Sequence, residues 1–281
     1  MMKKELEEKL KKLKTIISGY GQMLVALSGG VDSAFLLIFA WNMWRDDRVA
    51  ALTASGPNFA PDETRYAAEL CDRLGISHKT VNVDFLMSII EDNPPDRCYS
   101  CKKAIFSLLK ERADMVGSVL ADGTNLDDMS DYRPGYRAVE ELGVSSPLKD
   151  AGLTKAEIRE AMKAMAEEDS VIKGALAFAL WNKPAFACLA SRIPYGERIT
   201  VEKLKAVYKA ESLLMEEGFS QVRVRHHGDV ARIEVLPEDR SRFFDVEFMD
   251  RINEGIKKCG FKFAALDLGG YRMGNMNEEK K

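Results

Sequence analysis

Three of the five cysteines stand at positions where a thiolate could do chemistry. Cys98 and Cys101 have Cys-x-x-Cys spacing at the start of a predicted helix, in the stretch PPDRCYSCKKAIF. A helix N-terminus lowers the pKa of a thiol, so both are candidate thiolates. Cys188 follows in KPAFACLASRIPYG, a proline-containing loop without helical or strand periodicity. Cys71 and Cys259 occupy a core-like helical position and a helix end, and we expect both to be structural.

Three thiolates are compatible with three kinds of site. A structural zinc ion prefers four ligands, and His226 or His227 could supply the fourth. A redox dithiol would use Cys98 and Cys101, and it leaves Cys188 unexplained. A [4Fe–4S] cluster held by three cysteines leaves one iron open to a substrate or to an extra sulfide. The spacing alone does not rank the three.

A glycine pair lies between two apolar runs in MLVALSGGVDSAFLL, residues 23–37. A Walker loop would carry a lysine that reaches the β- and γ-phosphates, and this loop has none. Ser28, Gly29, Gly30 and Ser33 instead offer backbone N–H groups and hydroxyls at the positive end of a helix, which is an anion site. Asp32 would repel a phosphate there unless Mg²⁺ lies between them. We therefore predict a nucleotide phosphate site with Asp32 on magnesium; a plain turn capped by Asp32 is the alternative.

Strands and helices alternate through the first two thirds of the chain. The recurrence of apolar residues predicts an opening amphipathic helix on Leu6, Leu10, Leu13 and Ile17. Strands are predicted at MLVAL (23–27), RVAALTAS (48–55), HKTVNV (78–83) and SVLADG (118–123). Further helices are predicted at 33–44, 61–75, 101–117 and, behind a capping box of Thr154 and Glu157, 154–168. This alternation predicts an α/β fold with a doubly wound parallel sheet, which binds ligands at the carboxyl ends of its strands.

The pattern changes after SRIPYGERIT, residues 191–200. Helices are predicted at 201–218 and 240–260, and strands at 221–227, 230–236 and 261–271. We therefore expect two domains: residues 1–193, and a smaller α+β domain at 194–281 for substrate binding or oligomerisation. The apolar stretch DSVIKGALAFALW before the cysteine loop is expected to be a buried helix or an oligomer contact.

Composition excludes several classes of protein. The 281 residues carry a formal net charge of −3, so no overall positive field attracts nucleic acid or a membrane surface. No stretch of about 18 apolar residues occurs, so we expect no membrane span. The N-terminus is charged and helical in period rather than a signal peptide, which predicts a cytoplasmic location. An odd number of cysteines argues against a disulfide framework.

The motif SGGVDS after a strand resembles the PP-loop of ATP pyrophosphatases, which clamp ATP, release pyrophosphate and leave AMP on a substrate oxygen. Together with CYSCKKAIF, DGTNLDD, DYRPG, ACLASRIPYG, VRVRHHGDVARIE and ALDLGGYRMGNMN, it resembles the LarE family over almost the whole chain. Members are ATP-dependent sulfur transferases of nickel-pincer cofactor synthesis. The resemblance implies that a carboxylate of pyridinium-3,5-biscarboxylic acid mononucleotide is adenylylated and its activated oxygen replaced by sulfur, in two rounds.

The family has two branches. One gives up the sulfur of its own cysteine, a position that would align with Ala187. The other carries three cysteines that bind a [4Fe–4S] cluster, and the resemblance implies that its open iron carries a transferable sulfide. Cys98, Cys101 and Cys188 match the second branch, so the resemblance implies a cluster-dependent enzyme served by a sulfide or sulfur donor. The stretch EEDSVIKGALAFALWNKP is longer than the family pattern leads us to expect.

The resemblance also implies roles for single residues. Gly123 would permit close approach of the adenosine, and Arg133 would contact the α-phosphate, an ordinary surface arginine being the alternative. The anionic substrate would require cations, for which the candidates are Lys102, Arg192, Arg223 and Arg225. Family members assemble as homo-oligomers, trimers or hexamers.

Three other functions share part of this pattern. A tRNA thiolation enzyme also combines a PP-loop with cysteines, but a basic RNA-binding module is expected there and none is evident. An ammonia-using ligase such as GMP or NAD synthetase does not require three loop cysteines. A zinc-stabilised nucleotide-binding module would bind ATP but release no pyrophosphate when it is offered the pyridinium substrate.

Overall fold

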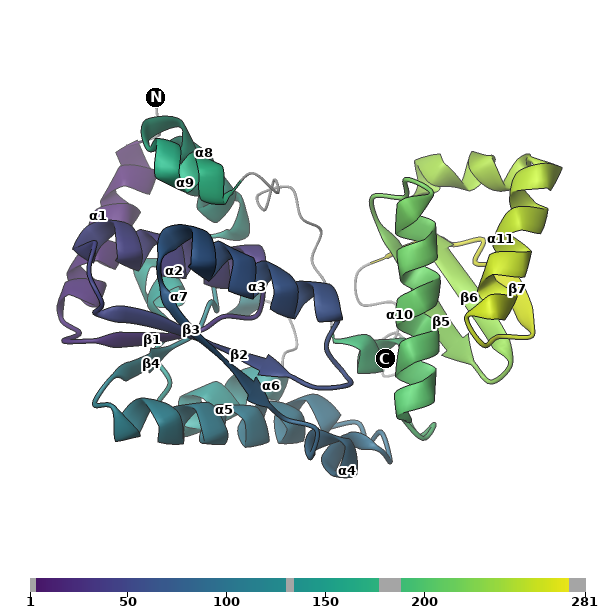
Figure 1. Ribbon diagram of the computed structural model, residues 1–281, viewed down its shortest axis with the longest axis horizontal. Helices are drawn as coiled ribbons and strands as arrows, with labels where there is room; N and C mark the ends of the chain where they lie inside the picture. The colour runs from purple at the N-terminus through teal and green to yellow at the C-terminus, as the bar shows by residue number, and fades with distance from the viewer. Residues whose placement is uncertain (1–3, 130–133, 177–187, 273–281) are drawn as a thin grey trace. The chain divides into compact units, whose positions relative to one another are not determined.

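The computed structural model describes residues 4–129, 134–176 and 188–272, which form two compact units (Figure 1). Among these residues the first unit comprises 4–56, 61–86, 96–129 and 134–176. The second comprises 57–60, 87–95 and 188–272. Each unit has its own sheet and its own buried core.

The first unit is built on a four-stranded parallel sheet. Its strands are β1 (Met23–Ala26), β2 (Val49–Ser55), β3 (Ser77–Asn82) and β4 (Val119–Ala121). They lie in the order β3-β2-β1-β4, and every pairing is parallel. The inner strands β1 and β2 are apolar because helices cover both faces, which leaves side chains such as Val25 and Ala51 buried. The predicted parallel α/β fold is confirmed, and β1, which leads into the glycine loop, lies between β2 and β4.

Helices cover the two faces of this sheet (Figure 1). On one face a common core joins α1 (Lys4–Ser18), α2 (Val31–Trp44), α3 (Pro61–Leu74), α7 (Pro147–Ala151), α8 (Lys155–Glu168) and α9 (Ser170–Ala175). On the other face lie α5 (Arg97–Met115) and α6 (Pro134–Glu141). Helix α2 is apolar on all sides because it is central to the core, where Phe35 and Ile38 are fully buried.

Local signals set several helix ends. The predicted capping box begins α8: Thr154 Oγ1 accepts from Glu157 N at 3.3 Å, and Thr154 N donates to Glu157 Oε2 at 2.9 Å. The described part of the apolar stretch forms α9, which buries Ile172 and Ala175 and leaves Val171 exposed, so it is a half-buried helix; its contact with another copy of the chain stays a prediction. Residues 177–187, including the expected position of the sacrificial cysteine at Ala187, lie outside the described residues.

The second unit contains a mixed sheet of β5 (Val222–His227), β6 (Val230–Val235) and β7 (Phe263–Leu266) in that order. Strands β5 and β6 are antiparallel, and β6 and β7 are parallel. Helix α10 (Val201–Glu216) packs against β5 and α11 (Val246–Lys258) against β7. The helix predicted at 240–260 is instead a 3₁₀ segment, η4 (Pro237–Phe244), followed by α11. The break occurs because Asp245 caps α11, accepting from Phe248 N at 2.7 Å.

Two short segments far from the C-terminal region in sequence belong to the second unit. Residues 57–60 follow β2, and residues 87–95 include most of α4 (Leu86–Ile90). The buried Asn93 side chain donates to Pro194 O at 2.6 Å, and Gly196 N donates to Asn93 O at 3.1 Å. The turn from Cys188 to Ile193 also lies in this unit, so the units divide before residue 188 rather than at the predicted 193/194.

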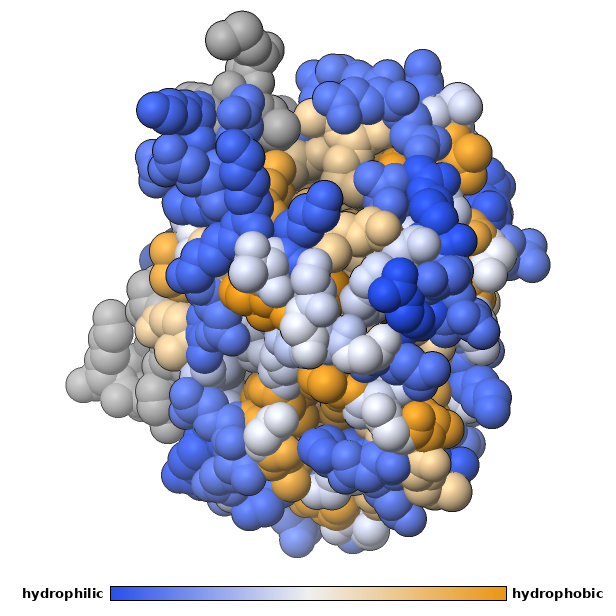
Figure 2. All heavy atoms as spheres, turned by 90° about the vertical axis from the view of Figure 1, so that its left-hand side faces the viewer, coloured by the Kyte–Doolittle hydropathy of each residue, from blue (hydrophilic) through white to orange (hydrophobic). Residues whose placement is uncertain are grey.

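Hydrophilic side chains dominate the face of the first unit shown in Figure 2, with apolar side chains in scattered groups. Among the described residues, no helix is long and apolar enough to cross a lipid bilayer.

Candidate functional site

The glycine loop joins β1 to the first turn of α2, and its backbone is tightly packed. Gly29 has a φ of 78°, a conformation that L-residues rarely adopt. A Cβ atom at this position would lie 2.5 Å from Glu63 O, at the start of α3. Gly30 is the N-cap residue of α2, and no side chain caps the helix there. The first N–H groups of α2 therefore face the loop, which is the arrangement of an anion site.

Replacing Gly29 by alanine is expected to destabilise the protein and to weaken ATP binding. Positive φ costs alanine about 1–2 kcal/mol, and the contact with Glu63 O forces the loop away from α3 in addition. Gly143→Ala is the matched control, because Gly143 has a φ of 63° and nothing within 4 Å of the added Cβ. Urea unfolding and calorimetry with a non-hydrolysable ATP analogue measure both effects. Equal losses in the two variants would contradict a special role for Gly29.

Two serine hydroxyls organise the loop from inside. Ser28 N donates to Ser33 Oγ at 3.2 Å, and Ser33 Oγ donates to Gly30 O at 3.2 Å. The two hydroxyl oxygens lie 3.1 Å apart, and Gly30 N donates to Ser28 Oγ at 3.3 Å. Ser33 is buried, so its hydroxyl supports the curvature of the loop. These are the serines and glycines that the sequence predicts for the phosphate site.

Asp32, in the first turn of α2, is a carboxylate in an unfavourable environment. Burial, and secondly the negative charge of Asp128, raise the pKa of Asp32 to about 6. The positive charges of nearby basic residues and a hydrogen bond from Asn125 Nδ2, 3.0 Å from Asp32 Oδ2, oppose that rise. A site with this much negative charge fits a divalent cation, whose charge favours the ionised carboxylate.

The loop after β4 supplies neighbours that the sequence predictions missed. Asp122 is buried and accepts hydrogen bonds from Thr124 N at 3.2 Å and Ser146 Oγ at 2.7 Å. Asn125 is fully buried, and its N–H donates to Asp128 Oδ2 at 3.3 Å. The available signal was the polar run DGTNLDD directly after a buried strand, where ligands of a parallel sheet bind.

Gly123, the residue predicted for the adenosine, lies against α2. A Cβ atom on Gly123 would come within 2.6 Å of Ser33 N, so only glycine allows the β4 loop this close to the phosphate loop. Beyond it, Lys155 Nζ lies 2.8 Å from Asp128 Oδ1. The structure thus brings the serines, glycines and Asp32 of the phosphate loop together with Gly123. Arg133 lies outside the described residues.

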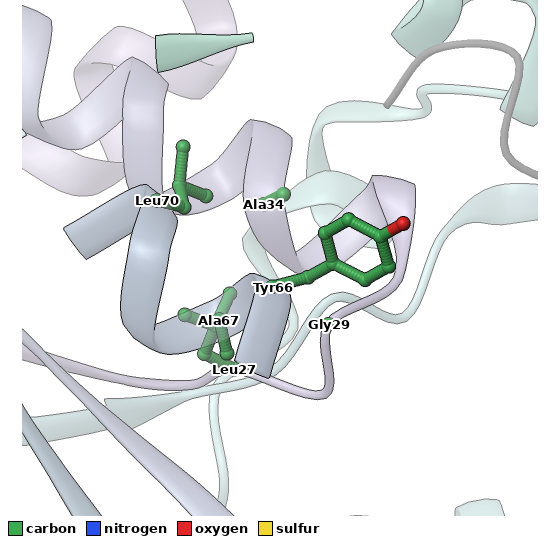
Figure 3. A pocket seen from close by; sticks show the side chains of 6 residues that line it. All are labelled: Leu27, Gly29, Ala34, Tyr66, Ala67 and Leu70. Atoms are coloured by element: carbon green, nitrogen blue, oxygen red, sulfur yellow. The ribbon is translucent and has the colours of Figure 1, made fainter. Parts of the chain in front are cut away.

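A small apolar hollow adjoins the phosphate loop (Figure 3). Figure 3 shows Tyr66 of α3 beside Gly29, with its hydroxyl turned away from the apolar side chains. The hollow is lined by Leu27, Gly29, Ala34, Tyr66, Ala67 and Leu70. The loop therefore has an apolar wall on the side of α3.

Cys98 and Cys101 lie in the first turns of α5, one exposed and the other half-buried. Helix α6 packs closely on this turn: a Cβ atom on Gly135 would lie 2.6 Å from Lys102 Cδ and 3.3 Å from Cys98 O. Lys102 is half-buried, with its Nζ 5.9 Å from the centre of the Phe106 ring. The structure thus places the predicted cysteine pair and Lys102 together at one helix end.

Cys188 belongs to the second unit, where it precedes the 3₁₀ segment η3 (Leu189–Arg192). Its thiol is exposed and outside any disulfide, and Asn58 Nδ2 donates to its Sγ at 3.6 Å. The described residues contain no group of three or more His, Cys, Asp or Glu side chains close enough to hold a metal ion. Cys98, Cys101 and Cys188 are outside any disulfide, and cysteine thiolate is the usual ligand of iron–sulfur clusters.

The three arginines predicted to meet the substrate are buried in the second unit. Arg192 forms a two-pronged ion pair with Glu211, at 2.8 and 3.0 Å. Arg225 Nε and Nη2 both donate to Glu234 Oε2, at 3.1 and 2.9 Å, and Arg225 Nη1 donates to Ser191 O at 3.0 Å. Burial, and secondly the charge of Arg192, lower the pKa of Arg223 to about 10.

Arg223 and Arg225 share one face of β5, as their spacing predicts. The two adjacent histidines differ in the way that strand alternation predicts. His226 is buried against Phe261, with the ring centres 5.2 Å apart, and burial lowers its pKa. His227 is exposed, and its Nε2 accepts from Arg232 Nε at 3.1 Å.

The remaining two cysteines are structural, as predicted. Burial raises the pKa of Cys71 to about 12, and its side chain belongs to the core of the first unit. The pKa of Cys259 is also raised by burial, and its thiol donates to Gly255 O at 3.3 Å. Neither thiol is prepared for reaction.

Comparison with known proteins assigns this site to a family. The chain is 39% identical over 259 residues to the pyridinium-3,5-bisthiocarboxylic acid mononucleotide synthase of Lactiplantibacillus plantarum, covering 92% of this chain and 89% of that protein. It is 37% identical over 274 residues to the protein slr1717 of Synechocystis, covering 97% of this chain and 98% of that protein.

A second group of matches is confined to part of the chain. The NAD synthase family model matches residues 2–116, which contain the phosphate loop and the cysteine pair. The glutamine-dependent NAD(+) synthetase of Xylella fastidiosa is 26% identical over 147 residues, 47% of this chain and 26% of that protein. The family model covers the PP-loop, whereas the matches to the synthase and to slr1717 span nearly the whole chain. The chain therefore belongs to the LarE family of ATP-dependent sulfur transferases, within the PP-loop ATP pyrophosphatases.

Proposed function

We propose that this protein adenylylates a carboxylate of pyridinium-3,5-biscarboxylic acid mononucleotide and replaces the activated oxygen with sulfur. The observation that carries the proposal is 39% identity over 92% of the chain to a pyridinium-3,5-bisthiocarboxylic acid mononucleotide synthase. The product belongs to nickel-pincer cofactor synthesis. The phosphate loop lacks the lysine of a Walker loop, and the PP-loop family to which it belongs releases pyrophosphate.

The activation half of the reaction takes place at the phosphate loop. Ser28, Gly29, Gly30 and Ser33 hold the phosphates of ATP with backbone N–H groups and hydroxyls, and Asp32 holds Mg²⁺. The ion supplies positive charge between the carboxylate and the phosphates. A substrate carboxylate oxygen attacks the α-phosphorus, and pyrophosphate leaves. Gly123, which lets the β4 loop lie against the phosphate loop, is proposed to face the adenosine, and Arg133 is proposed for the α-phosphate.

The sulfur half requires a nucleophile and a good leaving group. A sulfur atom attacks the carbonyl carbon of the acyl adenylate, and AMP leaves with the former carboxylate oxygen. Cys98, Cys101 and Cys188 are proposed to hold a [4Fe–4S] cluster, which would supply an open iron able to carry a sulfide. An external sulfide or sulfur donor must then restore the sulfide after each round.

The substrate brings a phosphate and two carboxylates, which need cations. We assign Lys102, beside the cysteine pair, and Arg223 of β5 to this role. Arg225, the other candidate on β5, is ion-paired with Glu234 and donates to Ser191 O at 3.0 Å. Arg192 is not assigned to the substrate, because its guanidinium group is ion-paired with Glu211. A cytoplasmic homo-oligomer, trimer or hexamer, remains our proposal from the family.

Pyrophosphate release tests the assignment against its rivals. The full chain is incubated with Mg²⁺-ATP and one acceptor at a time: the pyridinium biscarboxylate, unmodified tRNA, or ammonium with a dinucleotide acid acceptor. We expect release with the pyridinium substrate alone. Release with tRNA or with ammonium would replace the proposal by a thiolation enzyme or a ligase, and no release with any acceptor would favour a binding module.

A further inference from the structure

The backbone turn that carries Cys188 is tied to side chains buried behind it. Ser191 N donates to Cys188 O at 2.9 Å, which closes the first turn of η3. Arg192 Nη1 donates to the same carbonyl oxygen at 3.2 Å and to Ser191 Oγ at 2.9 Å. The carbonyl of Cys188 is therefore held by a guanidinium group as well as by the backbone.

That guanidinium group is itself fixed. The side chains of Arg192 and Glu211 are both 0% exposed, and two hydrogen bonds join them. Glu211 Oε1 also accepts from Val224 N at 3.0 Å, which links the pair to β5. Because α10 and β5 are regular elements, the orientation of Arg192 is set by rigid structure.

A second contact holds the other side of the turn. Leu189 N donates to Asn58 O at 3.0 Å, and Asn58 Nδ2 donates to Cys188 Sγ at 3.6 Å. Cys188 Sγ in turn lies 3.4 Å from Asn58 O. Asn58 is 1% exposed, so its amide is held in place by the protein around it.

We propose that Arg192, fixed by Glu211, and Asn58 are positioning residues that hold the Cys188 turn for the sulfur step. This inference rests on the proposed function, because it assumes that Cys188 takes part in sulfur transfer. It gives Arg192 a role other than the substrate contact that the sequence predicts. The carboxylate of Glu211 neutralises the guanidinium charge, and the donors beyond that pair are directed at Cys188 O and Ser191 Oγ.

A buried ion pair contributes little to the free energy of folding, but it fixes the orientation of its two side chains. Replacing such a pair with neutral groups of similar volume is often close to neutral for folding, whereas removing one partner alone leaves a buried charge. The pair is better explained by the geometry it imposes on the Cys188 carbonyl. Misplacing a reacting group by about 1 Å can cost a hundredfold in rate.

The double variant Arg192→Met with Glu211→Gln tests the proposal. It removes both charges together, and the glutamine amide that replaces the Glu211 carboxylate still offers an oxygen to Val224 N. We expect sulfur transfer to fall at least tenfold, with the KM for the pyridinium substrate in pyrophosphate release within twofold of the parent. Hydrogen exchange of the amides of 189–193 is expected to accelerate at least tenfold while β6 is unchanged. Asn58→Ala, which removes the amide donor to Sγ, is expected to lower sulfur transfer in the same direction.

A matched control separates this effect from a general loss of ion pairs. Arg251 and Glu217 form a two-pronged Arg–Glu pair on the surface of the same unit, at 3.2 and 3.0 Å, with side chains 58% and 26% exposed. Arg251→Met with Glu217→Gln makes the same chemical change at this exposed pair. We expect both half-reactions and the exchange at 189–193 to match the parent.

Two results would overturn the proposal. A KM for the pyridinium substrate raised tenfold, with unchanged exchange at 189–193, would make Arg192 a substrate contact. If the double variant kept both the hydrogen exchange at 189–193 and the sulfur transfer of the parent, Arg192 would have no role in holding the turn. If the parent chain itself transfers no sulfur, the proposed function fails, and the exchange data still decide whether Arg192 holds the turn.

Discussion

Replacing Asp32 by asparagine is expected to abolish pyrophosphate release and to make the folded protein more stable at pH 8. The activity falls by at least about a thousandfold, because the amide cannot hold Mg²⁺ against the phosphates. The stability rises because Asp32 has a folded-state pKa raised to about 6, so its ionised form is disfavoured in the native protein. Removing the charge contributes on the order of 2 kcal/mol of stability at pH 8.

The pH dependence has a definite sign. A carboxyl group with a raised pKa destabilises the folded state above that pKa, and the penalty disappears as the pH falls towards the ordinary value. The gain from Asp32→Asn should therefore be full above about pH 7 and vanish near pH 4. Guanidinium unfolding at both pH values measures it, with Asp47→Asn, on the exposed surface, as the control. A variant that is less stable than the parent at pH 8 would contradict this account of Asp32.

Removing the three predicted cluster cysteines is expected to separate the two halves of the reaction. In the variant Cys98→Ala, Cys101→Ala, Cys188→Ala, sulfur transfer should fall below detection, since none of the three accessible thiols remains to hold iron or to donate sulfur. Pyrophosphate release in a single turnover should persist within a fewfold, because the phosphate loop is untouched. Iron content after anaerobic reconstitution and rapid-quench assays of pyrophosphate and thiocarboxylate provide the readout.

The control for the cysteine variant is Cys259→Ala, which changes a half-buried thiol hydrogen-bonded to Gly255 O. It should retain both iron and sulfur transfer. Full sulfur transfer by the triple variant would mean that the sulfur follows another route. Loss of pyrophosphate release together with sulfur transfer would mean that the cysteines also shape the activation site.

Local signals were sufficient to predict the phosphate loop and most elements around it. The strand, the glycine pair and the helix beginning near Asp32 are consecutive in sequence, so periodicity and turn residues identify them. The loop after β4 was harder. Its motif DGTNLDD was visible, but only Gly123 was given a role, because the sequence does not show that β4 is the neighbour of β1. Because β4 pairs with β1, Asn125 Nδ2 comes within hydrogen-bond distance of Asp32 Oδ2.

The second unit shows the limit of local reasoning more clearly. Residue type identifies Arg192, but not the partner Glu211, which lies on a different element and neutralises the charge. Similarly, nothing near Asn58 in the sequence indicates that it meets Cys188, a residue 130 positions away. Contacts of this kind depend on how elements pack, which a single sequence does not disclose.

The transfer of labelled sulfur tests the central claim most directly. The full chain is reconstituted anaerobically with iron and isotopically labelled sulfide, and Mg²⁺-ATP and the pyridinium biscarboxylate are then added. The masses of the product and of the protein are measured by mass spectrometry. The account predicts a labelled thiocarboxylate with AMP and pyrophosphate in equal amounts, several turnovers when sulfide is supplied, and an unchanged mass at Cys188. An unlabelled thiocarboxylate, formed once per chain with Cys188 lighter by one H₂S, would contradict the cluster route. No thiocarboxylate at all would contradict the proposed function.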